Sequence, residues 1–192
     1  MKSRNQIETA IRMVSNLGTA ALSELSEAFT LYSFASGTSL SCQGEVDEME
    51  YLLLSGRARS LVRDADGREA TLGLFDGPMI LPPNLARTSK GLSLVDIETL
   101  DDVVVAKLST RKLMEKMVQS TEIRDWGNQI MQNELTAKVE REWCLAALPA
   151  RERLDWFRVN YNGFEKRFSH AFIASFLGMT PVTLSRLRNS KP

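Results

Sequence analysis

The sequence predicts an α+β protein with a β-rich N-terminal domain, one long helix and a small C-terminal helical domain. Seven of the 11 glycines lie between residues 31 and 108, among short apolar or alternating runs typical of a sandwich or barrel. Residues 122–148 contain no proline and one glycine, as a long helix requires. Two short helical patterns follow near the C-terminus. The predicted domain boundaries are 1–120, 121–148 and 149–192.

The first domain is expected to begin with helices and continue as strands. Apolar residues recur at helical spacing over residues 5–30, and Gly18 is expected to break this stretch into two helices. The strands follow over about 31–108. Asp64-Ala65-Asp66-Gly67 lies between two alternating runs and predicts a hairpin turn. Ser109 is expected to cap a helix that starts near Thr110.

The long helix carries two apolar stripes, of which one can cover the β domain while the other faces a partner subunit. The alternative is a helix buried within a single chain. Met131, Leu135, Val139 and Trp143 form one stripe. The other, which repeats roughly every seven residues, is the predicted dimer interface and comprises Ile123, Trp126, Ile130 and Ala137. The sequence does not decide which of the two pairs the subunits.

The composition excludes several classes of protein. Hydrophobic residues make up 43% of the chain, which argues against global disorder, and no apolar run is long enough to span a membrane. No signal-peptide core follows Met1, so a cytoplasmic location is expected. With two cysteines and one histidine, the sequence predicts no disulfide framework, metal site, iron–sulfur cluster or haem. No carboxylate or serine stands in a catalytic motif, so no enzyme activity is expected.

The net charge of zero is a sum of two unlike segments. Residues 1–150 hold 16 Lys or Arg against 21 Asp or Glu, a balance of −5. Residues 151–192 hold 8 against 3, a balance of +5. This asymmetry predicts an anionic partner for the C-terminal segment. The alternative is a soluble protein whose charges happen to be sorted in this way.

Residues 168–188 predict a helix-turn-helix. Ser169 can cap a first helix that runs to Leu177, and Gly178 can end it in the left-handed conformation. Thr180 and Pro181 supply the cap and the first turn of a second helix. Such a pair of helices can place the second one in the major groove of DNA, and the alternative is a helical hairpin with no nucleic-acid role.

An arginine on the second helix could bind guanine O6 and N7 through two hydrogen bonds, and the hydroxyl groups could donate to phosphates or bases. The guanine contact is assigned to Arg186, and Lys191 is expected to contact phosphate. The full set of predicted DNA-binding residues is Ser169, Thr180, Pro181, Val182, Thr183, Ser185, Arg186 and Arg188.

Residues 180–186, with the pair Ser185-Arg186, resemble the recognition-helix segment of the CRP/FNR superfamily of bacterial transcription regulators. The long helix stands where that superfamily has its dimerisation helix. Further segments resemble its cyclic-nucleotide-binding-like β-roll, a double-stranded β-helix or jelly roll: Gly37-Thr38-Ser39-Leu40, Gly44-Glu45, Tyr51-Leu52-Leu53-Leu54-Ser55-Gly56 and Asp66-Gly67-Arg68-Glu69. The resemblance implies a homodimer that binds double-stranded DNA, RNA polymerase as a further partner, and an unknown small-molecule effector.

The chain departs from the superfamily's pattern in its DNA-binding region. Val182 replaces a glutamate that could accept from cytosine, so an altered DNA site is expected, with Val182 against a thymine methyl group. Four residues follow Arg188 in the sequence, so no β-hairpin wing is expected.

The β-roll also departs from the superfamily's pattern. Where superfamily members that bind cyclic AMP have Gly-Glu-Leu for the ribose, Gly77-Pro78-Met79 aligns best, and Pro78 in place of the glutamate argues against cyclic-nucleotide binding. The phosphate-binding pair falls at Arg87-Thr88 when counted from Gly77, or at Ser93-Leu94 when counted back from Val103. The predicted effector-pocket residues are Gly77, Met79, Arg87 and Thr88.

Two other functions compete with a regulator of transcription. One is a small-molecule-binding β-roll protein whose helical tail contacts proteins and not DNA. The other is an enzyme with a cupin barrel, and the single histidine of the chain argues against the metal site that such an enzyme would need.

Overall fold

The structure is a computed structural model and describes residues 2–189. The chain divides into two compact units. Unit 1 comprises Met1–Ser60 and Leu74–Leu135, and unit 2 comprises Leu61–Gly73 and Thr136–Pro192. Across the described residues, no helix combines the length and apolar character that a membrane crossing needs.

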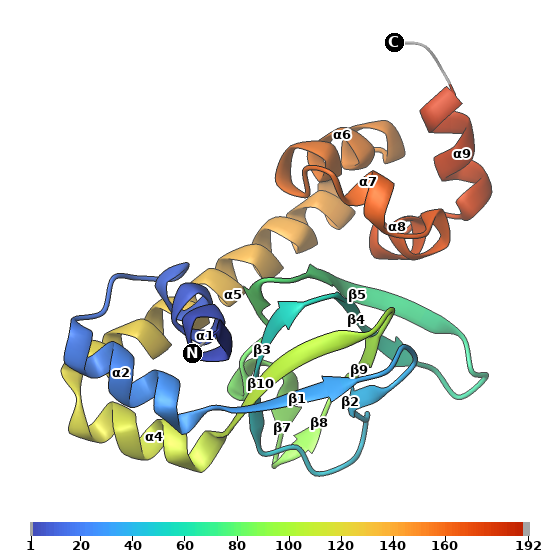
Figure 1. Cartoon of the computed structure of the whole chain (residues 1–192). Coiled ribbons are helices and arrows are strands. Elements are labelled where there is room, and N and C mark those ends of the chain that lie inside the picture. The colour runs from blue at the N-terminus through green and yellow to red at the C-terminus, as the bar shows by residue number, and fades with distance from the viewer. Residues whose placement is uncertain (1, 190–192) are drawn as a thin grey trace. The chain divides into compact units, whose positions relative to one another are not determined.

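Two four-stranded sheets form the β-roll, and the predicted α+β fold with a jelly-roll domain is confirmed (Figure 1). In the first sheet, neighbouring strands are antiparallel and follow the order β1 (Thr30–Phe34), β10 (Val103–Ser109), β3 (Met49–Ser55) and β6 (Met79–Ile80). The second sheet has the order β2 (Ser39–Ser41), β9 (Asp96–Thr99), β4 (Arg57–Arg63) and β5 (Glu69–Asp76). A short pair, β7 (Thr88–Ser89) and β8 (Leu92–Ser93), completes the roll.

Strand β3 is buried on both faces. Tyr51 and Leu53 lie in an apolar cluster inside the roll, whereas Leu52 and Leu54 lie in a second cluster under the helices. Because side chains alternate along a strand, burial on both faces needs a continuous apolar run, which the sequence supplies here.

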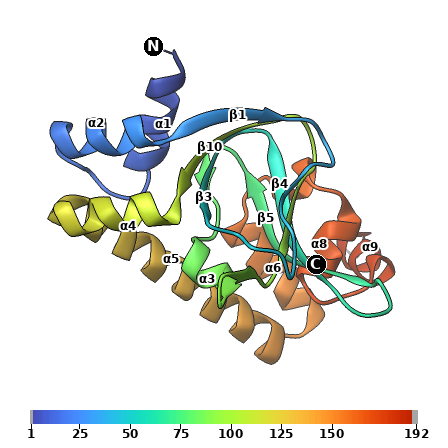
Figure 2. The same cartoon turned by 90° about the horizontal axis from the view of Figure 1, so that it is seen from below.

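Helices cover the outer face of the first sheet. They are α1 (Lys2–Arg12), α2 (Thr19–Ala28), α4 (Thr110–Gln119) and the first half of α5 (Thr121–Ala147), while α3 (Asn84–Arg87) follows β6. Figures 1 and 2 show α2 and α4 side by side, and Lys116 Nζ donates to Glu24 Oε1 between them at 2.9 Å. The predicted cap of α4 is confirmed, because Ser109 Oγ accepts from the Lys112 amide at 3.3 Å.

The start of α5 lies in the apolar cluster between the first sheet and its helices. Two of the predicted dimer-interface residues are therefore wrongly assigned. Ile123 is 0% and Trp126 is 2% exposed, and both lie in the cluster under the helices. Trp126 Nε1 donates to the carbonyl oxygen of Ile11 at 3.0 Å. These two side chains stabilise their own subunit and are not on its surface. The apolar spacing correctly predicted that Ile123 and Trp126 are buried, but they are covered by α1 and α2 of the same chain and not by a second subunit.

Within residues 61–73 and 136–189, unit 2 combines a β-hairpin with five helical segments. The hairpin turn at Gly67 is confirmed: this residue has φ +77°, and its amide donates to the Asp64 carbonyl at 3.0 Å. The helical segments are the second half of α5, α6 (Ala150–Asn160), α7 (Phe164–Arg167), α8 (His170–Phe176) and α9 (Pro181–Asn189). An aromatic cluster forms the core, in which Phe157, Tyr161 and Phe176 have ring centroids 5.0 to 5.8 Å apart.

Candidate nucleic-acid interface

Local hydrogen bonds define the helix-turn-helix as predicted. Ser169 Oγ accepts from the Phe172 amide at 3.2 Å and caps α8. Gly178 follows with φ +61°, the left-handed conformation that ends a helix at low cost only in glycine. Thr180 Oγ1 then accepts from the Thr183 amide at 3.1 Å and caps α9, whose first residue is Pro181. These short-range bonds fix where each helix begins and ends.

Arginine side chains from α6 hold the turn in place. Arg153 Nη1 donates to the carbonyl oxygens of Leu177 and Gly178, at 3.2 and 3.4 Å. Arg151 Nη1 donates to the carbonyl oxygen of Leu187 near the end of α9, at 3.0 Å. Carbonyl groups at helix ends lack partners within the helix, so these guanidinium groups satisfy them. The sequence indicates no role for either arginine beyond its charge, because the bonds link residues 24 to 36 positions apart.

Helix α9 buries one face and presents the other. Leu184 is fully buried against α8, and Thr183 is half-buried. Val182, Ser185 and Arg186 are exposed together on the outer face. The other predicted DNA-binding residues Ser169, Thr180, Pro181 and Arg188 are exposed as well. The exposed face therefore combines a guanidinium group, hydroxyl groups and one apolar side chain, which are the groups that contact DNA bases and phosphates.

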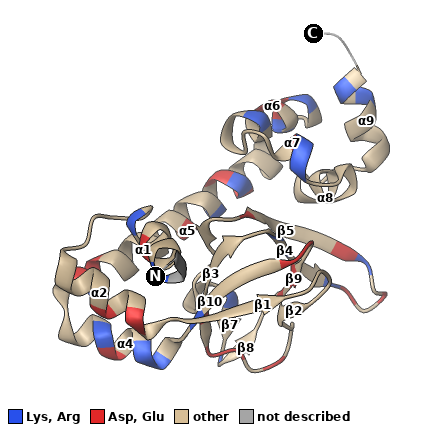
Figure 3. Cartoon of the chain, in the orientation of Figure 1, with Lys and Arg blue, Asp and Glu red and all other residues tan. Residues whose placement is uncertain are grey.

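Basic residues gather on α6, α7 and α9, as Figure 3 shows, but several of them are engaged within unit 2. Glu165 Oε2 accepts from Arg158 Nε at 2.7 Å, and its Oε1 accepts from Arg188 Nε at 3.1 Å. Arg188 Nη1 also lies 3.0 Å from His170 Nδ1. The local charge of +5 therefore overstates what a polyanion would meet. Lys191 lies outside the described residues.

Glu165 is expected to stabilise unit 2 at neutral pH and to lose this effect in acid. The hydrogen bond from Arg158, reinforced by the charges of Arg158 and Arg188, lowers the pKa of Glu165 below its ordinary value. A carboxyl group with a lowered pKa stabilises the fold above its unfolded-state pKa, and that contribution is lost as the pH falls through the folded value. We expect Glu165→Gln to lower the free energy of unfolding by about 1 kcal/mol at neutral pH.

Denaturant unfolding at a series of pH values measures this effect. The difference between Glu165→Gln and the parent chain should shrink as the pH falls below about 4.3, the ordinary pKa of glutamate. Glu142→Gln on α5, which removes an exposed carboxylate, serves as the control. A difference that stays constant down to acid pH would contradict the assignment.

Arg141 joins the hairpin to α8 within unit 2. Its Nη2 donates to the carbonyl oxygens of Thr71 and Phe176, at 3.2 and 2.9 Å, and its guanidinium carbon lies 4.6 Å from the centroid of the Phe176 ring. The amide of Thr71 donates to Ser175 Oγ at 2.9 Å. Burial lowers the pKa of Arg141. The first helix of the helix-turn-helix is thus fixed by a strand as well as by helices, a contact that sequence spacing does not predict.

The predicted effector-pocket residues lie in unit 1. Two of them, Arg87 and Thr88, already have hydrogen-bond or ion-pair partners within the protein. Arg87 is 2% exposed and forms an ion pair with Asp47, while its Nε donates to the Pro82 carbonyl at 3.0 Å. Thr88 Oγ1 donates to the carbonyl oxygen of Asn84 at 2.9 Å. A phosphate at Arg87 would have to displace the Asp47 carboxylate, so the ion pair argues against a ready-made phosphate site.

The other two predicted pocket residues, Gly77 and Met79, are adjacent to strand β3. The amide of Gly77 donates to the carbonyl oxygen of Gly56 at 2.9 Å, and a Cβ there would lie 3.0 Å from the backbone of Ser55. Met79 is paired with Leu53 in the first sheet. The segment that aligns with the ribose-binding loop is therefore a short bend at Gly77-Pro78 that leads directly into strand β6.

The second half of α5 has exposed apolar side chains, whereas the apolar side chains of its first half are buried. Leu135, Val139 and Trp143 are each more than half exposed and share one face of the helix by their spacing of four residues. Of the remaining predicted interface residues, Ile130 is half-buried and Ala137 is exposed on the opposite side of α5. The exposed stripe is therefore the one that the sequence places at Met131, Leu135, Val139 and Trp143.

Comparison with solved structures identifies the fold. FixK2 from Bradyrhizobium japonicum is 19% identical over 83% of this chain and 82% of its own, with a TM-score of 0.72. The c-di-GMP-responsive global regulator CLP from Xanthomonas campestris is 15% identical over 88% and 89% of the two chains, with a TM-score of 0.67. A CooA mutant from Carboxydothermus hydrogenoformans is 19% identical over 85% of this chain and 76% of its own, with a TM-score of 0.69.

At the level of sequence there is no such match. No family model and no curated protein sequence matches the chain. FixK2, CLP and CooA are regulators of the CRP/FNR superfamily, and the predicted resemblance is confirmed in the fold. The chain has the CRP/FNR fold, a cyclic-nucleotide-binding-like β-roll followed by a long helix and a helix-turn-helix.

Proposed function

We propose that this chain is a homodimeric, sequence-specific DNA-binding regulator of transcription, whose β-roll responds to a small molecule. The observation that carries the proposal is the exposed face of α9. Val182, Ser185 and Arg186 lie together on it, while Leu184 anchors the opposite face. The second helix of a helix-turn-helix reads base edges with this kind of outward face. The fold shared with FixK2 and CLP supports the same function.

Two copies of α9 in a dimer would read the half-sites of a two-fold symmetric DNA sequence about one helical turn apart. The exposed stripe of Leu135, Val139 and Trp143 on α5 is suited to pair the subunits, because helices with such a stripe associate to bury it. RNA polymerase is a further partner if the regulator activates transcription, whereas a repressor that occludes the DNA site needs no such contact.

A second function, contact between unit 2 and another protein, is favoured by two exposed apolar side chains. Val159 on α6 and Val182 on α9 are both exposed, as they would be on a surface that contacts a protein. Selection from a pool of random duplexes, at several salt concentrations, distinguishes the two functions. A two-fold symmetric selected site supports the DNA-binding regulator, and an absence of salt-dependent binding at every concentration would favour the protein-binding alternative.

Arg186→Ala is expected to weaken binding to the selected site by about 1–3 kcal/mol and to relax base preference at one position in each half-site. The reason is that two parallel hydrogen bonds to guanine O6 and N7 would be lost. Competition binding with duplexes that vary one base pair at a time measures both effects.

Arg186→Lys is the matched control, because lysine keeps the charge but lacks the planar fork of donors. It should retain the salt dependence of binding and show a weaker base preference than the parent chain. If both variants kept the preference of the parent chain, Arg186 would not read a base.

A further inference from the structure

Unit 1 contains a pocket that is separate from the predicted effector residues. Its cavity volume is about 60 Å³, and the pocket is partly open to solvent. Its walls come from β3, the β6–α3 segment, α4 and the first half of α5. None of Gly77, Met79, Arg87 and Thr88 lines it.

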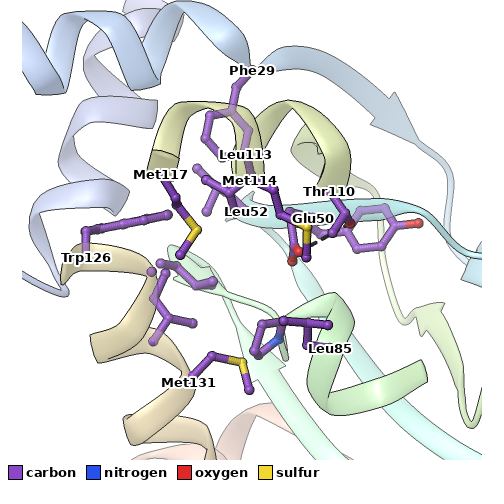
Figure 4. Close-up of a pocket in the computed structure, with 15 residues that line it drawn as sticks. Phe29, Glu50, Leu52, Leu85, Thr110, Leu113, Met114, Met117, Trp126 and Met131 are labelled. Carbon is purple, nitrogen blue, oxygen red and sulfur yellow. Dashed lines mark hydrogen bonds between the residues drawn. The ribbon is translucent and has the colours of Figure 1, made fainter. Parts of the chain in front are cut away.

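The lining of the pocket is almost entirely apolar. Leu52 and Trp126 are buried at its inner wall, while Leu85 is 61% exposed at its rim. Figure 4 shows Met117 from α4 and Met131 from α5 extending toward the space between these helices. Methionine side chains are flexible and polarisable, so they adapt to ligands of different shape. A surface of this kind favours a ligand with an apolar body.

Two polar side chains supply hydrogen-bonding groups at one side of the pocket. Glu50 Oε2 accepts from the Asn84 amide at 2.9 Å, and Oε1 accepts from Thr110 Oγ1 at 3.3 Å (Figure 4). Each carboxylate oxygen can accept a second hydrogen bond, so Glu50 can also take a donor from a ligand. Burial raises the pKa of Glu50, and the hydrogen bond from Asn84 opposes that shift.

The charge of the pocket selects against anions. No lysine, arginine or histidine is among the described residues that line it. The nearby cation Arg87 is committed to Asp47. A phosphate or carboxylate group would therefore meet the acidic Glu50 in an apolar environment with no compensating cation, which is unfavourable.

We propose that this pocket binds an uncharged apolar molecule with one hydrogen-bond donor, an alcohol or an aryl amine, whose donor contacts Glu50 and whose apolar body lies among Met114, Met117 and Met131. This ligand class differs from the cyclic nucleotides, which carry a phosphate. The proposal does not depend on DNA binding and can hold or fail independently of the proposed function.

Binding of N-phenylnaphthylamine to the full chain, in the absence of DNA, tests the proposal. This probe is an uncharged aryl amine with one N–H, and its fluorescence rises in apolar surroundings. We expect saturable binding of one probe per chain, displaced by octanol but not by octanoate or cyclic AMP at neutral pH. Octanol and octanoate have apolar tails of similar length, so the comparison isolates the effect of charge. Absence of saturable binding, or equal displacement by octanoate, would overturn the proposal.

Paired substitutions on α4 locate the probe. Met114→Trp enlarges a side chain at the pocket wall. Val118→Trp is the control, because it introduces tryptophan one helical turn away, at a position that is 84% exposed and does not line the pocket. We expect Met114→Trp to weaken probe binding about tenfold, which corresponds to roughly 1.4 kcal/mol, and Val118→Trp to leave it unchanged. Leu85→Trp at the rim replaces Met114→Trp if the latter fails to fold. Equal effects at wall and control positions would place the probe elsewhere.

Glu50→Gln tests the polar contact. Glutamine keeps an acceptor for the Asn84 amide, and its neutral amide removes the repulsion of anions. Octanol should therefore still displace the probe, and octanoate should compete better than it does with the parent chain, although the apolar lining still disfavours its charge. If octanoate remained excluded from this variant, Glu50 would not be the discriminating group and the assignment would be wrong.

Discussion

Phe176→Ala is expected to lower the free energy of unfolding by about 3–5 kcal/mol. Phe176 is buried at the end of α8, where its ring lies 5.8 Å from that of Phe157 and 5.1 Å from that of Tyr161. Its ring also lies beneath the Arg141 guanidinium group. Alanine would leave a cavity in the aromatic core and remove the aromatic partner of a largely buried cation, and both effects are destabilising.

Denaturant unfolding measures the total loss, and amide hydrogen exchange locates it. Exchange should accelerate in α6 and α8, because the Phe176 ring of α8 packs against the rings of Phe157 in α6 and Tyr161 directly after it. Val159→Ala is the control, since Val159 is an exposed apolar residue on α6 and its truncation should change stability by less than about 0.5 kcal/mol. Equal losses for the two variants would show that the aromatic cluster does not stabilise unit 2.

Val139→Asp is expected to convert the proposed dimer to monomers and to weaken binding to a two-half-site duplex by about 100-fold or more. Val139 is 56% exposed at the middle of the stripe between Leu135 and Trp143. A carboxylate there would be desolvated without a partner if two helices paired through this face. Losing the dimer removes the gain from linking two binding modules.

Ala137→Asp supplies a matched control, because it introduces the same residue two positions away, on the opposite side of α5. Sedimentation or light scattering gives the mass, which for a monomer is 21.5 kDa. Val139→Asp should bind a single half-site duplex as the parent monomer would. Dissociation by Ala137→Asp, with Val139→Asp still dimeric, would assign the interface to the other side of the helix.

Sequence reasoning predicted most accurately the features that depend on short-range bonds. Ser109, Ser169 and Thr180 cap their helices as expected, since a side-chain oxygen and an amide three residues later need no distant partner. Gly178 adopts the expected left-handed conformation, and the predicted hairpin turn forms at Gly67, for the same local reason. The strands of the roll were also predictable, because β3 and its neighbours need a continuous or alternating apolar pattern.

Features that depend on distant contacts were not predictable in this way. The spacing of Ile123 and Trp126 indicates a buried face but does not say whether α1 or a second subunit covers it. Arg87 has the residue type of a phosphate site, yet it pairs with Asp47, 40 positions earlier. The charge sum counts Arg153 as available, although it donates to the carbonyl groups of the turn. In each case the partner comes from another part of the chain.

The bonds from Arg141 and Ser175 to Thr71 have a consequence for how the protein can be divided. Because unit 2 includes residues 61–73, which span the end of β4, the hairpin turn and the start of β5, no single break in the chain yields all of it. A fragment that starts at residue 136 keeps the helix-turn-helix but leaves the Ser175 hydroxyl group and the Arg141 guanidinium group without these partners. A chimaera made by one crossover in the long helix would likewise join these helices to a foreign hairpin. Exchange of the helix-turn-helix between proteins of this fold would therefore require matched changes in the hairpin.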